Sequence, residues 1–391
     1  MAGPSFGKSM DAQVVDVSGS GICVLLPLPV PCGATIEIID GTADGLRTVI
    51  LGQACRCVPH EGGFTAGIRV LRIWAAADTQ QLKRDRHGPT LIHNEIVQTN
   101  RIAIFGSGGQ LGVELKTEFT KRGYEVNCFE RSHVDITNAA QVEKCLAQCD
   151  PAIVLNAAAY NQVDVAENEP HASYAVNGLA VRNLALACRQ VDARLVHFST
   201  DYVFDGMAGR AYTEQDTPRP LGAYAVSKLA GEYYARAYLD SVLIVRTSGV
   251  YGPGALDTAR GNFVELMLRL AAKGQPIRVV EDHVASPTFA PALASRTADL
   301  AERGAQGLFH IGGGTPISWF DWAVKIFDAA GLHPPLKPTN EREFRAAARR
   351  PKYSALSNVK MESLGIAPMP SLDQAIGLYL LARNRRLAPA S

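Results

Sequence analysis

The stretch RIAIFGSGGQLGVEL, residues 101–115, decides how the larger part of this chain folds. A short apolar strand pattern runs directly into a loop with glycines at positions 106, 109 and 112, and an amphipathic helix pattern follows. In such a loop Gly106 allows a tight turn, Gly109 lets a pyrophosphate approach the backbone, and Gly112 lets the helix pack close to the strand. The amino end of the helix favours an anion. The stretch therefore predicts the first strand, turn and helix of a dinucleotide-binding sheet.

After residue 101, apolar strand patterns alternate with helical ones. The strand candidates are RIAIFG, AIVLNAA, RLVHFST and SVLIVRTS, and the helix candidates include QLGVELKTEFTKRG and AVRNLALACRQV. This alternation is typical of βαβ units in an α/β fold. We therefore expect a doubly wound, parallel Rossmann-type sheet in a domain over residues 101–391.

The first part of the chain has a different pattern. Residues 11–75 contain short β-branched or alternating runs, separated by the turn sequences SGSG, PVPCG, DGTADG and PHEGG. Strands at this spacing predict a small all-β barrel, which we place in a domain over residues 1–85. The polar residues 76–100 favour a helix that runs into a linker, with the linker at 86–100.

Composition excludes several classes of function. The 391 residues are 47% hydrophobic and 20% charged with a net charge of +1, which is typical of a soluble globular protein and gives no electrostatic footprint for nucleic acid. No apolar run approaches the ~20 residues that span a bilayer, and GICVLLPLPVPCG is interrupted by prolines, unlike a secretion signal. The eight cysteines show no zinc spacing and suit a reducing compartment. We expect a cytoplasmic protein without a metal site and with no membrane or nucleic-acid partner.

The second strand of the α/β part ends in two charges of opposite sign. Glu130 would accept hydrogen bonds from an adenosine ribose and favour NAD, whereas Arg131 would pair with a 2′-phosphate and favour NADP. Both are present, so NADPH and NADH remain open, and either charge could be a solvated loop residue. Asp135 follows shortly after. It is a further candidate for the cofactor site, and the alternative is that it only caps the next helix.

The stretch AYAVSKLAGE, residues 223–232, places Tyr224 and Lys228 on one face of a predicted helix. One interpretation is an ordinary solvated helix face. The other is an acid–base pair, because a nearby cation lowers the pKa of a tyrosine. Thr200 ends the strand RLVHFST and so falls at the edge of the sheet where open parallel sheets bind ligands.

These motifs together resemble the dTDP-4-dehydrorhamnose reductase family of extended short-chain dehydrogenases/reductases. The resemblance rests on the stretches GSGGQLG, NAAAYNQVDVAENEP, FSTDYVFDG, YAVSK followed by GE, RTSGVYGPG, GNFVELMLRLA, VASPTFAPALA and RRPKYSAL, which occur in family order. It implies that NADPH or NADH reduces the C4 ketone of a nucleotide-linked 4-keto-6-deoxysugar. In that reaction Tyr224 would donate the proton, Lys228 would hold the nicotinamide ribose and lower the tyrosine pKa, and Thr200 would hydrogen-bond the carbonyl oxygen.

The resemblance also implies that the Rossmann-type sheet carries a smaller substrate subdomain with C-terminal substrate-binding parts, and it implies the remaining site residues. Those expected at the cofactor are Gly106, Gly109, Gln110, Leu111, Gly112, Glu130, Arg131, Asp135, Ile136, Ala158, Ala159, Tyr160 and Lys228. Those expected at the sugar are Asn161, Val163, Thr200, Asp201 and Tyr202. A homodimer is a further expectation.

Departures from the family pattern concern the sugar pocket. Gly249 stands where the family usually has a tryptophan that packs on the sugar, and His283 and Ala285 replace the more usual glutamine and glycine. A 4,6-dehydratase would need glutamate after Asp201, where this chain has Tyr202. The alternatives are a nucleotide-sugar epimerase and a non-catalytic regulatory subunit that keeps the dinucleotide site.

The motif DVSGSG at residues 16–21, with GQACRCV and FTAGIRVL downstream, resembles a PilZ domain. That resemblance implies cyclic di-GMP as a ligand, contacted by Asp16, Ser18 and Gly21. The companion R-x-x-x-R motif is absent, which makes the domain a degenerate PilZ-like one. The alternative is a polar turn in a docking or dimerisation module.

Overall fold

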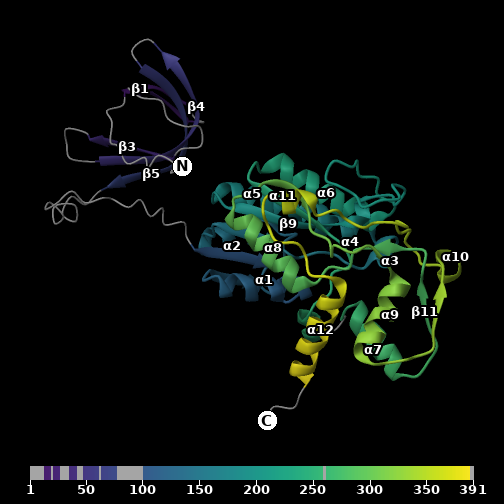
Figure 1. Cartoon of the computed structure of the whole chain (residues 1–391). Coiled ribbons are helices and arrows are strands. Elements are labelled where there is room, and N and C mark those ends of the chain that lie inside the picture. The colour runs from purple at the N-terminus through teal and green to yellow at the C-terminus, as the bar shows by residue number, and fades with distance from the viewer. Residues whose placement is uncertain are drawn as a thin grey trace. The chain divides into compact units, whose positions relative to one another are not determined.

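The computed structural model describes residues 13–18, 21–26, 35–41, 47–60, 63–76, 100–258 and 261–387. The chain divides into two compact units, Met1–Asn94 and Glu95–Ser391. Figure 1 shows the elements of both units. The predicted helix and linker at 76–100 lie almost entirely outside the described residues.

The first unit contains five strands: β1(Gln13–Ser18), β2(Gly21–Leu26), β3(Thr35–Gly41), β4(Arg47–His60) and β5(Gly63–Ala76). They form one antiparallel sheet in the order β1-β2-β5-β4-β3. Closure of this sheet into a barrel stays a prediction. So does cyclic di-GMP binding, because the side chains of the motif at 16–21 lie outside what is described.

The second unit is an α/β domain. The strands of its main sheet are β6(Arg101–Phe105), β7(Glu125–Phe129), β8(Ile153–Asn156), β9(Arg194–Thr200), β10(Val242–Thr247) and β13(Gly307–His310). The helices and helical turns before β10 are α1(Gln110–Lys121), α2(Ala139–Cys149), α3(Val163–Ala166), α4(Pro170–Tyr174), η1(Ala175–Leu179), α5(Ala180–Gln190), η2(Asp201–Val203) and α6(Ala223–Tyr238). Those after it are η3(Pro253–Asp257), α7(Phe263–Ala272), α8(Ala290–Glu302), α9(Trp319–Ala330), α10(Glu341–Phe344), α11(Val359–Ser363) and α12(Leu372–Leu387).

The six strands are parallel, in the order β13-β10-β9-β8-β6-β7, which confirms the predicted Rossmann-type sheet. Strand β6 pairs with β7 on one side and with β8 on the other, so successive strands are added on opposite sides of β6, which is the topological switch point of the sheet. Ligands of open parallel sheets bind beyond the carboxyl ends of the strands at such a point.

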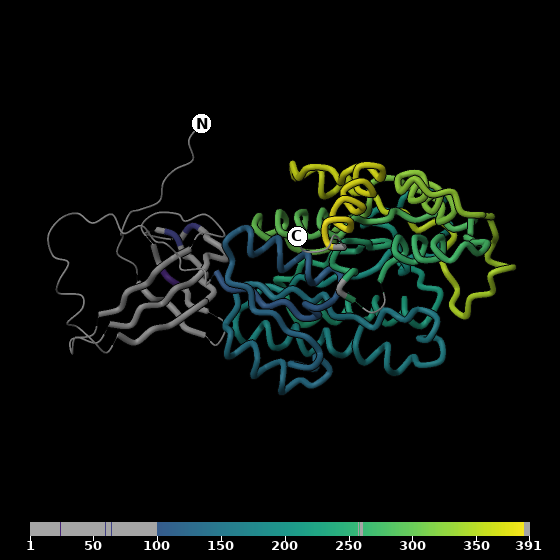
Figure 2. The backbone as a smooth tube through the Cα atoms, turned by 90° about the horizontal axis from the view of Figure 1, so that it is seen from below, coloured from purple at the N-terminus to yellow at the C-terminus, as the bar shows by residue number. Residues whose placement is uncertain are grey.

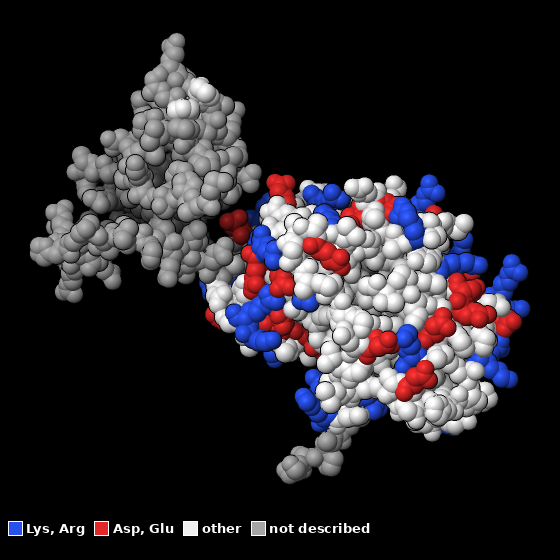
Figure 3. Space-filling view, viewed as in Figure 1, with Lys and Arg blue, Asp and Glu red and all other residues white. Residues whose placement is uncertain are grey.

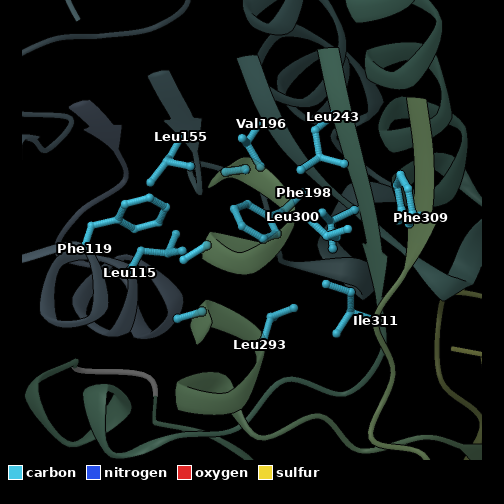
Figure 4. Packing of buried hydrophobic residues seen from close by; sticks show 14 of the residues in the cluster. Leu115, Phe119, Leu155, Val196, Phe198, Leu243, Leu293, Leu300, Phe309 and Ile311 are labelled. Atoms are coloured by element: carbon cyan, nitrogen blue, oxygen red, sulfur yellow. The ribbon is translucent and has the colours of Figure 1, made fainter. Parts of the chain in front are cut away.

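Helices cover both faces of the sheet, so that the central strands β8, β9 and β10 are buried on both sides. On one face Leu115 and Phe119 of α1 and Leu293 and Leu300 of α8 belong to one hydrophobic cluster with Leu155 and Val196 of the sheet (Figure 4). The other face is covered by α2, α5 and α6, through residues that include Val142, Leu184 and Ala235. The catalytic candidates on β9 and α6 therefore lie on elements that are packed into the hydrophobic core of the domain.

A smaller part contains the remaining elements. It has a parallel pair, β11(Ile277–Val280) with β15(Leu336–Thr339), and an antiparallel pair, β12(Val284–Ala285) with β14(Ile317–Ser318). Its core joins α7, α9 and α12 around Trp322, Tyr251 and Tyr379. In Figures 1 and 2, α7, α9 and β11 lie together at the end of this unit away from α2.

The surface of the second unit has mixed charge. On the face shown in Figure 3, Lys and Arg side chains are interspersed with Asp and Glu. No helix among the described residues is both long and apolar enough to cross a bilayer.

Candidate active site

The glycine loop after β6 leaves no room for side chains. Gly106 has a φ of +76°, and a Cβ there would lie 2.6 Å from the backbone nitrogen of Ala158. A Cβ on Gly112 would lie 2.7 Å from the Cα of Ser107, so this glycine lets α1 begin directly against the loop. The amino end of α1 has Gly109 as its N-cap and no side-chain cap. Its first N–H groups are therefore not capped by the N-cap side chain, as an anion site requires.

A cavity of about 350 Å³ lies at the carboxyl ends of β6, β7 and β8. It is within the size range of small-molecule and cofactor sites. Eight predicted cofactor residues line it, namely Gly106, Glu130, Arg131, Asp135, Ile136, Ala158, Ala159 and Tyr160, together with Asn161 from the predicted sugar set. Sequence reasoning missed Phe105, Val134, Gln162 and Val176, which complete the lining.

Gln110 and Leu111 lie at the start of α1 with their side chains engaged elsewhere. Gln110 donates a hydrogen bond to the Val250 carbonyl oxygen at 2.8 Å and accepts one from Asn262 at 3.2 Å. Leu111 packs against the hydrophobic core. If these two residues contact a cofactor, they do so through backbone N–H groups.

Asp135 does not cap the next helix. Asn138 does so, by accepting a hydrogen bond from the Gln141 backbone at 3.2 Å. Asp135 Oδ1 instead accepts the backbone N–H of Thr137 at 3.0 Å and its hydroxyl at 2.8 Å. These hydrogen bonds lower the pKa of Asp135 and keep an ionised carboxylate at the wall of the cavity.

Tyr224 and Lys228 lie on α6, one turn apart, as predicted. The Lys228 ammonium is buried and donates to the Phe198 carbonyl oxygen of β9 at 2.6 Å. Burial lowers the pKa of Lys228 to about 8, although the charge of Glu232 partly opposes that shift. The rings of Tyr224 and Tyr202 are 6.1 Å apart and perpendicular. These contacts bring the end of β9 and the amino-terminal turns of α6 together.

Thr200 ends β9 and is 7% exposed. Its Oγ1 accepts the Tyr202 backbone N–H at 3.2 Å and donates to Asp201 Oδ1 at 3.1 Å. The neighbouring Tyr202 hydroxyl has a pKa raised to about 12, by burial first and by the charge of Asp201 second. At neutral pH Tyr202 is therefore a neutral phenol that can donate a hydrogen bond.

Asn177 joins Tyr160, on the wall of the cavity, to Ser227 of α6, and sequence reasoning missed it. It lies in the π-helical turn η1 and is 1% exposed. Its amide accepts the Tyr160 N–H at 2.9 Å and donates to the Tyr160 carbonyl at 3.0 Å and to Ser227 Oγ at 3.0 Å. Ser227 in turn donates to the Tyr224 carbonyl at 2.7 Å. A buried asparagine in a helical sequence gives no local signal for such a role.

Sequence reasoning also missed an ion pair, Asp164–Arg350, which lies beside the predicted sugar residues. Arg350 makes two hydrogen bonds to Asp164, at 2.7 and 3.0 Å, and the guanidinium also interacts with the Tyr202 hydroxyl. Asp164 directly follows Val163, the first residue of α3. This pair links the segment around residue 350 to the expected sugar side of the site.

Gly249 lies beside an indole ring that comes from another element. It has a φ of +48°, and a Cβ there would be 3.9 Å from Cη2 of Trp319, the first residue of α9. Burial lowers the pKa of the His283 imidazole, and the backbone carbonyl oxygen of His283 accepts a hydrogen bond from the backbone N–H of Trp319 at 3.2 Å. The position that departs from the family pattern is therefore next to a half-buried tryptophan.

Comparisons with known proteins agree with this geometry. A family model described as "RmlD substrate binding domain" matches residues 100–384. The dTDP-4-dehydrorhamnose reductase of Mycobacterium tuberculosis strain H37Rv is 38% identical over 291 residues, which cover 73% of this chain and 94% of that protein. The spore coat polysaccharide biosynthesis protein SpsK of Bacillus subtilis is 35% identical over 284 residues, covering 73% of this chain and 98% of the relative.

A solved structure shows the same fold. The dTDP-4-dehydrorhamnose reductase of Bacillus anthracis, determined in complex with NADP, superposes with a TM-score of 0.69 and is 36% identical. The match covers 72% of this chain and 98% of that one. The family match spans the glycine loop, the cavity, β9 and α6. The chain belongs to the RmlD substrate binding domain family and is a dTDP-4-dehydrorhamnose reductase-like oxidoreductase.

Proposed function

We propose that this protein uses NADPH or NADH to reduce the C4 ketone of a nucleotide-linked 4-keto-6-deoxysugar. The specific reaction is dTDP-4-dehydro-L-rhamnose to dTDP-L-rhamnose, as the names of the relatives suggest. The observation that carries the proposal is the placement of Tyr224, Lys228 and Thr200 at the carboxyl end of the same sheet as the dinucleotide cavity.

The residues at the cavity fit a dinucleotide. Gly106 and Gly112 keep the backbone open where a pyrophosphate would lie, and the first turn of α1 supplies N–H groups. Glu130 and Arg131 both line the cavity at the end of β7, so both the ribose and a 2′-phosphate have a partner there. The bound cofactor supplies the hydride.

The chain supplies the proton and orients the ketone. Tyr224 gives its phenolic proton to the oxygen of the reduced carbonyl, which balances the hydride added at carbon. The buried Lys228 ammonium holds the ribose hydroxyls and favours the tyrosinate that remains. Thr200 at the end of β9 and Tyr202 in the following turn η2 supply the hydroxyl groups that meet the sugar.

A regulatory scaffold is the alternative of a different class, and one variant separates it from an enzyme. Tyr224→Phe should lower turnover of dTDP-4-dehydro-L-rhamnose about 10²- to 10⁴-fold. Its dissociation constants for NADPH and NADH, measured by fluorescence titration, should stay within a factor of about two of the wild type. Full activity in Tyr224→Phe would exclude Tyr224 as the proton donor. Cofactor binding without turnover of any 4-ketosugar by the wild type would favour the scaffold.

A further inference from the structure

Asp201 is a buried carboxyl group that accepts hydrogen bonds from three hydroxyls. It is 2% exposed and lies directly after Thr200. Thr200 Oγ1 donates to its Oδ1 at 3.1 Å, and Ser248 donates to its Oδ2 at 2.8 Å. The hydroxyl of Ser354 donates to the same Oδ2. The three donors come from the end of β9, the loop after β10 and the segment before α11.

The Thr200 hydroxyl has one proton, and its direction decides what the residue can do. Thr200 Oγ1 already accepts the Tyr202 backbone N–H at 3.2 Å. An ionised carboxylate can only accept hydrogen bonds, so the Thr200 proton points to Asp201 while Asp201 is ionised. A ketone oxygen also only accepts. With an ionised Asp201 neighbour, Thr200 can therefore donate to a ketone only by giving up its hydrogen bond to Asp201.

We propose that Asp201 controls whether Thr200 can donate a hydrogen bond to the substrate ketone. Protonated Asp201 donates to its neighbours and releases the Thr200 proton toward the ketone, whereas ionised Asp201 retains that proton. Asp201 is then a positioning residue that acts through Thr200, and the idea rests on the proposed reductase function. No net proton transfer occurs through this pair, because the hydride comes from NAD(P)H and the proton from Tyr224.

The surroundings place this exchange in an accessible pH range. Burial raises the pKa of Asp201 to about 6, against the opposing effect of its three hydroxyl donors. The charge of Asp201 acts on the Tyr202 hydroxyl, which also interacts with the Asp164–Arg350 pair and whose ring contacts that of Tyr224 on α6. The three direct partners of the carboxyl are uncharged.

The first test is the pH profile of kcat/KM for the ketosugar, at saturating NADPH, between about pH 5 and 7.5. The wild type should lose activity as the pH rises through about 6, by up to about tenfold per pH unit. Asp201→Asn should not show this fall in activity near pH 6 (the limb of the profile), because its amide does not titrate. Ser248→Ala removes a donor that stabilises the carboxylate, so its limb should move to higher pH. The control Ser363→Ala, at an exposed serine of α11, should keep the wild-type profile.

A second test does not need turnover. The pKa of Asp201 is measured by ¹³C NMR of the side-chain carboxyls, with its signal assigned by its loss in Asp201→Asn. Thr200→Val should raise this pKa, and Ser363→Ala should leave it unchanged. An unchanged pKa in Thr200→Val, or a limb near pH 6 that persists in Asp201→Asn, overturns the proposal. If the wild type reduces no ketosugar but Thr200→Val raises the pKa, the reductase function fails while the Thr200–Asp201 coupling stands.

Discussion

Glu232 of α6 and Arg246 of β10 form a buried, two-point ion pair behind the catalytic candidates. Arg246 Nε lies 2.8 Å from Glu232 Oε1, and its Nη2 lies 2.7 Å from Oε2. The side chains are 3% and 4% exposed. Ser199, the residue before Thr200, also donates to Glu232 Oε1. One carboxylate therefore ties α6 to both β9 and β10, one helical turn after Lys228.

This pair should be costly to break from one side. Arg246→Met leaves the Glu232 carboxylate buried without its cation, and we expect a loss of about 3–5 kcal/mol in the free energy of unfolding. The double variant Arg246→Met/Glu232→Leu removes both charges and should be clearly more stable than Arg246→Met alone. Urea denaturation of the three proteins measures both differences. A single variant as stable as the wild type would show that the pair does not hold these elements together.

Crowding at the glycine loop can be separated from backbone strain. Gly106 and Gly123 have similar φ values, +76° and +85°, but a Cβ on Gly123 would meet no atom within 4 Å. Gly123→Ala should therefore cost about 1 kcal/mol of stability through the backbone alone and leave NADPH affinity unchanged. Gly106→Ala forces a Cβ into the Ala158 backbone and should weaken NADPH binding at least tenfold. Equal effects of the two substitutions on the NADPH dissociation constant would contradict this account of the loop.

Lys228 should make stability depend on pH in the alkaline range. Its pKa of about 8 in the folded protein is below the ~10.4 of an unfolded lysine, so the unfolded chain binds more protons between these values. The free energy of unfolding of the wild type, relative to Lys228→Met, should be constant below about pH 8. It should then rise with pH, by about 3 kcal/mol by pH 10.4, an order-of-magnitude figure. Urea unfolding at pH 7 and 9.5 compares the two proteins, and an unchanged difference would show that Lys228 is not desolvated.

Gly249 stands where the family pattern has a tryptophan that packs on the sugar. We expect Trp319 to supply an aromatic ring to the sugar pocket in its place. Its ring lies 3.9 Å from the position of a Cβ on Gly249. Trp319→Ala should raise the KM for the ketosugar about tenfold, with little change in kcat, because an apolar contact of this kind binds substrate and transition state alike. Trp319→Phe, which keeps an aromatic ring, should recover most of the affinity. An unchanged KM in Trp319→Ala would place the sugar away from α9.

Local sequence patterns predict the parts of this site that a few neighbouring residues determine. The glycine loop follows from strand, glycine spacing and helix within residues 101–115, and Tyr224 and Lys228 share a helix face because they are four residues apart. The parallel direction of the strands follows from the alternation of strands and helices, whereas their order is known only from the structure. In these cases the backbone period or the size of a side chain fixes the outcome.

Other contacts depend on residues that are distant in the chain. Ser248 and Ser354 have no local signal that would direct them to Asp201, and Asn177 lies in an ordinary helical sequence. Asp135 and Asn138 are both good cap residues, and only the final turn geometry shows that Asn138 is the cap. Ser248, Ser354 and Asn177 meet their partners only when segments distant in the chain pack together, which local propensity does not describe.

The hydrogen bond from Ser354 to Asp201 joins residues 153 positions apart, so it can form only late in protein synthesis. Every residue that lines the cavity lies between Phe105 and Val176, early in the second unit. A growing chain on the ribosome therefore contains every residue of this cavity long before Ser354 emerges to complete the surroundings of Thr200. During translation, the cavity wall is synthesised first, Lys228 of α6 follows, and the last hydrogen-bond donor to Asp201 comes more than a hundred residues later.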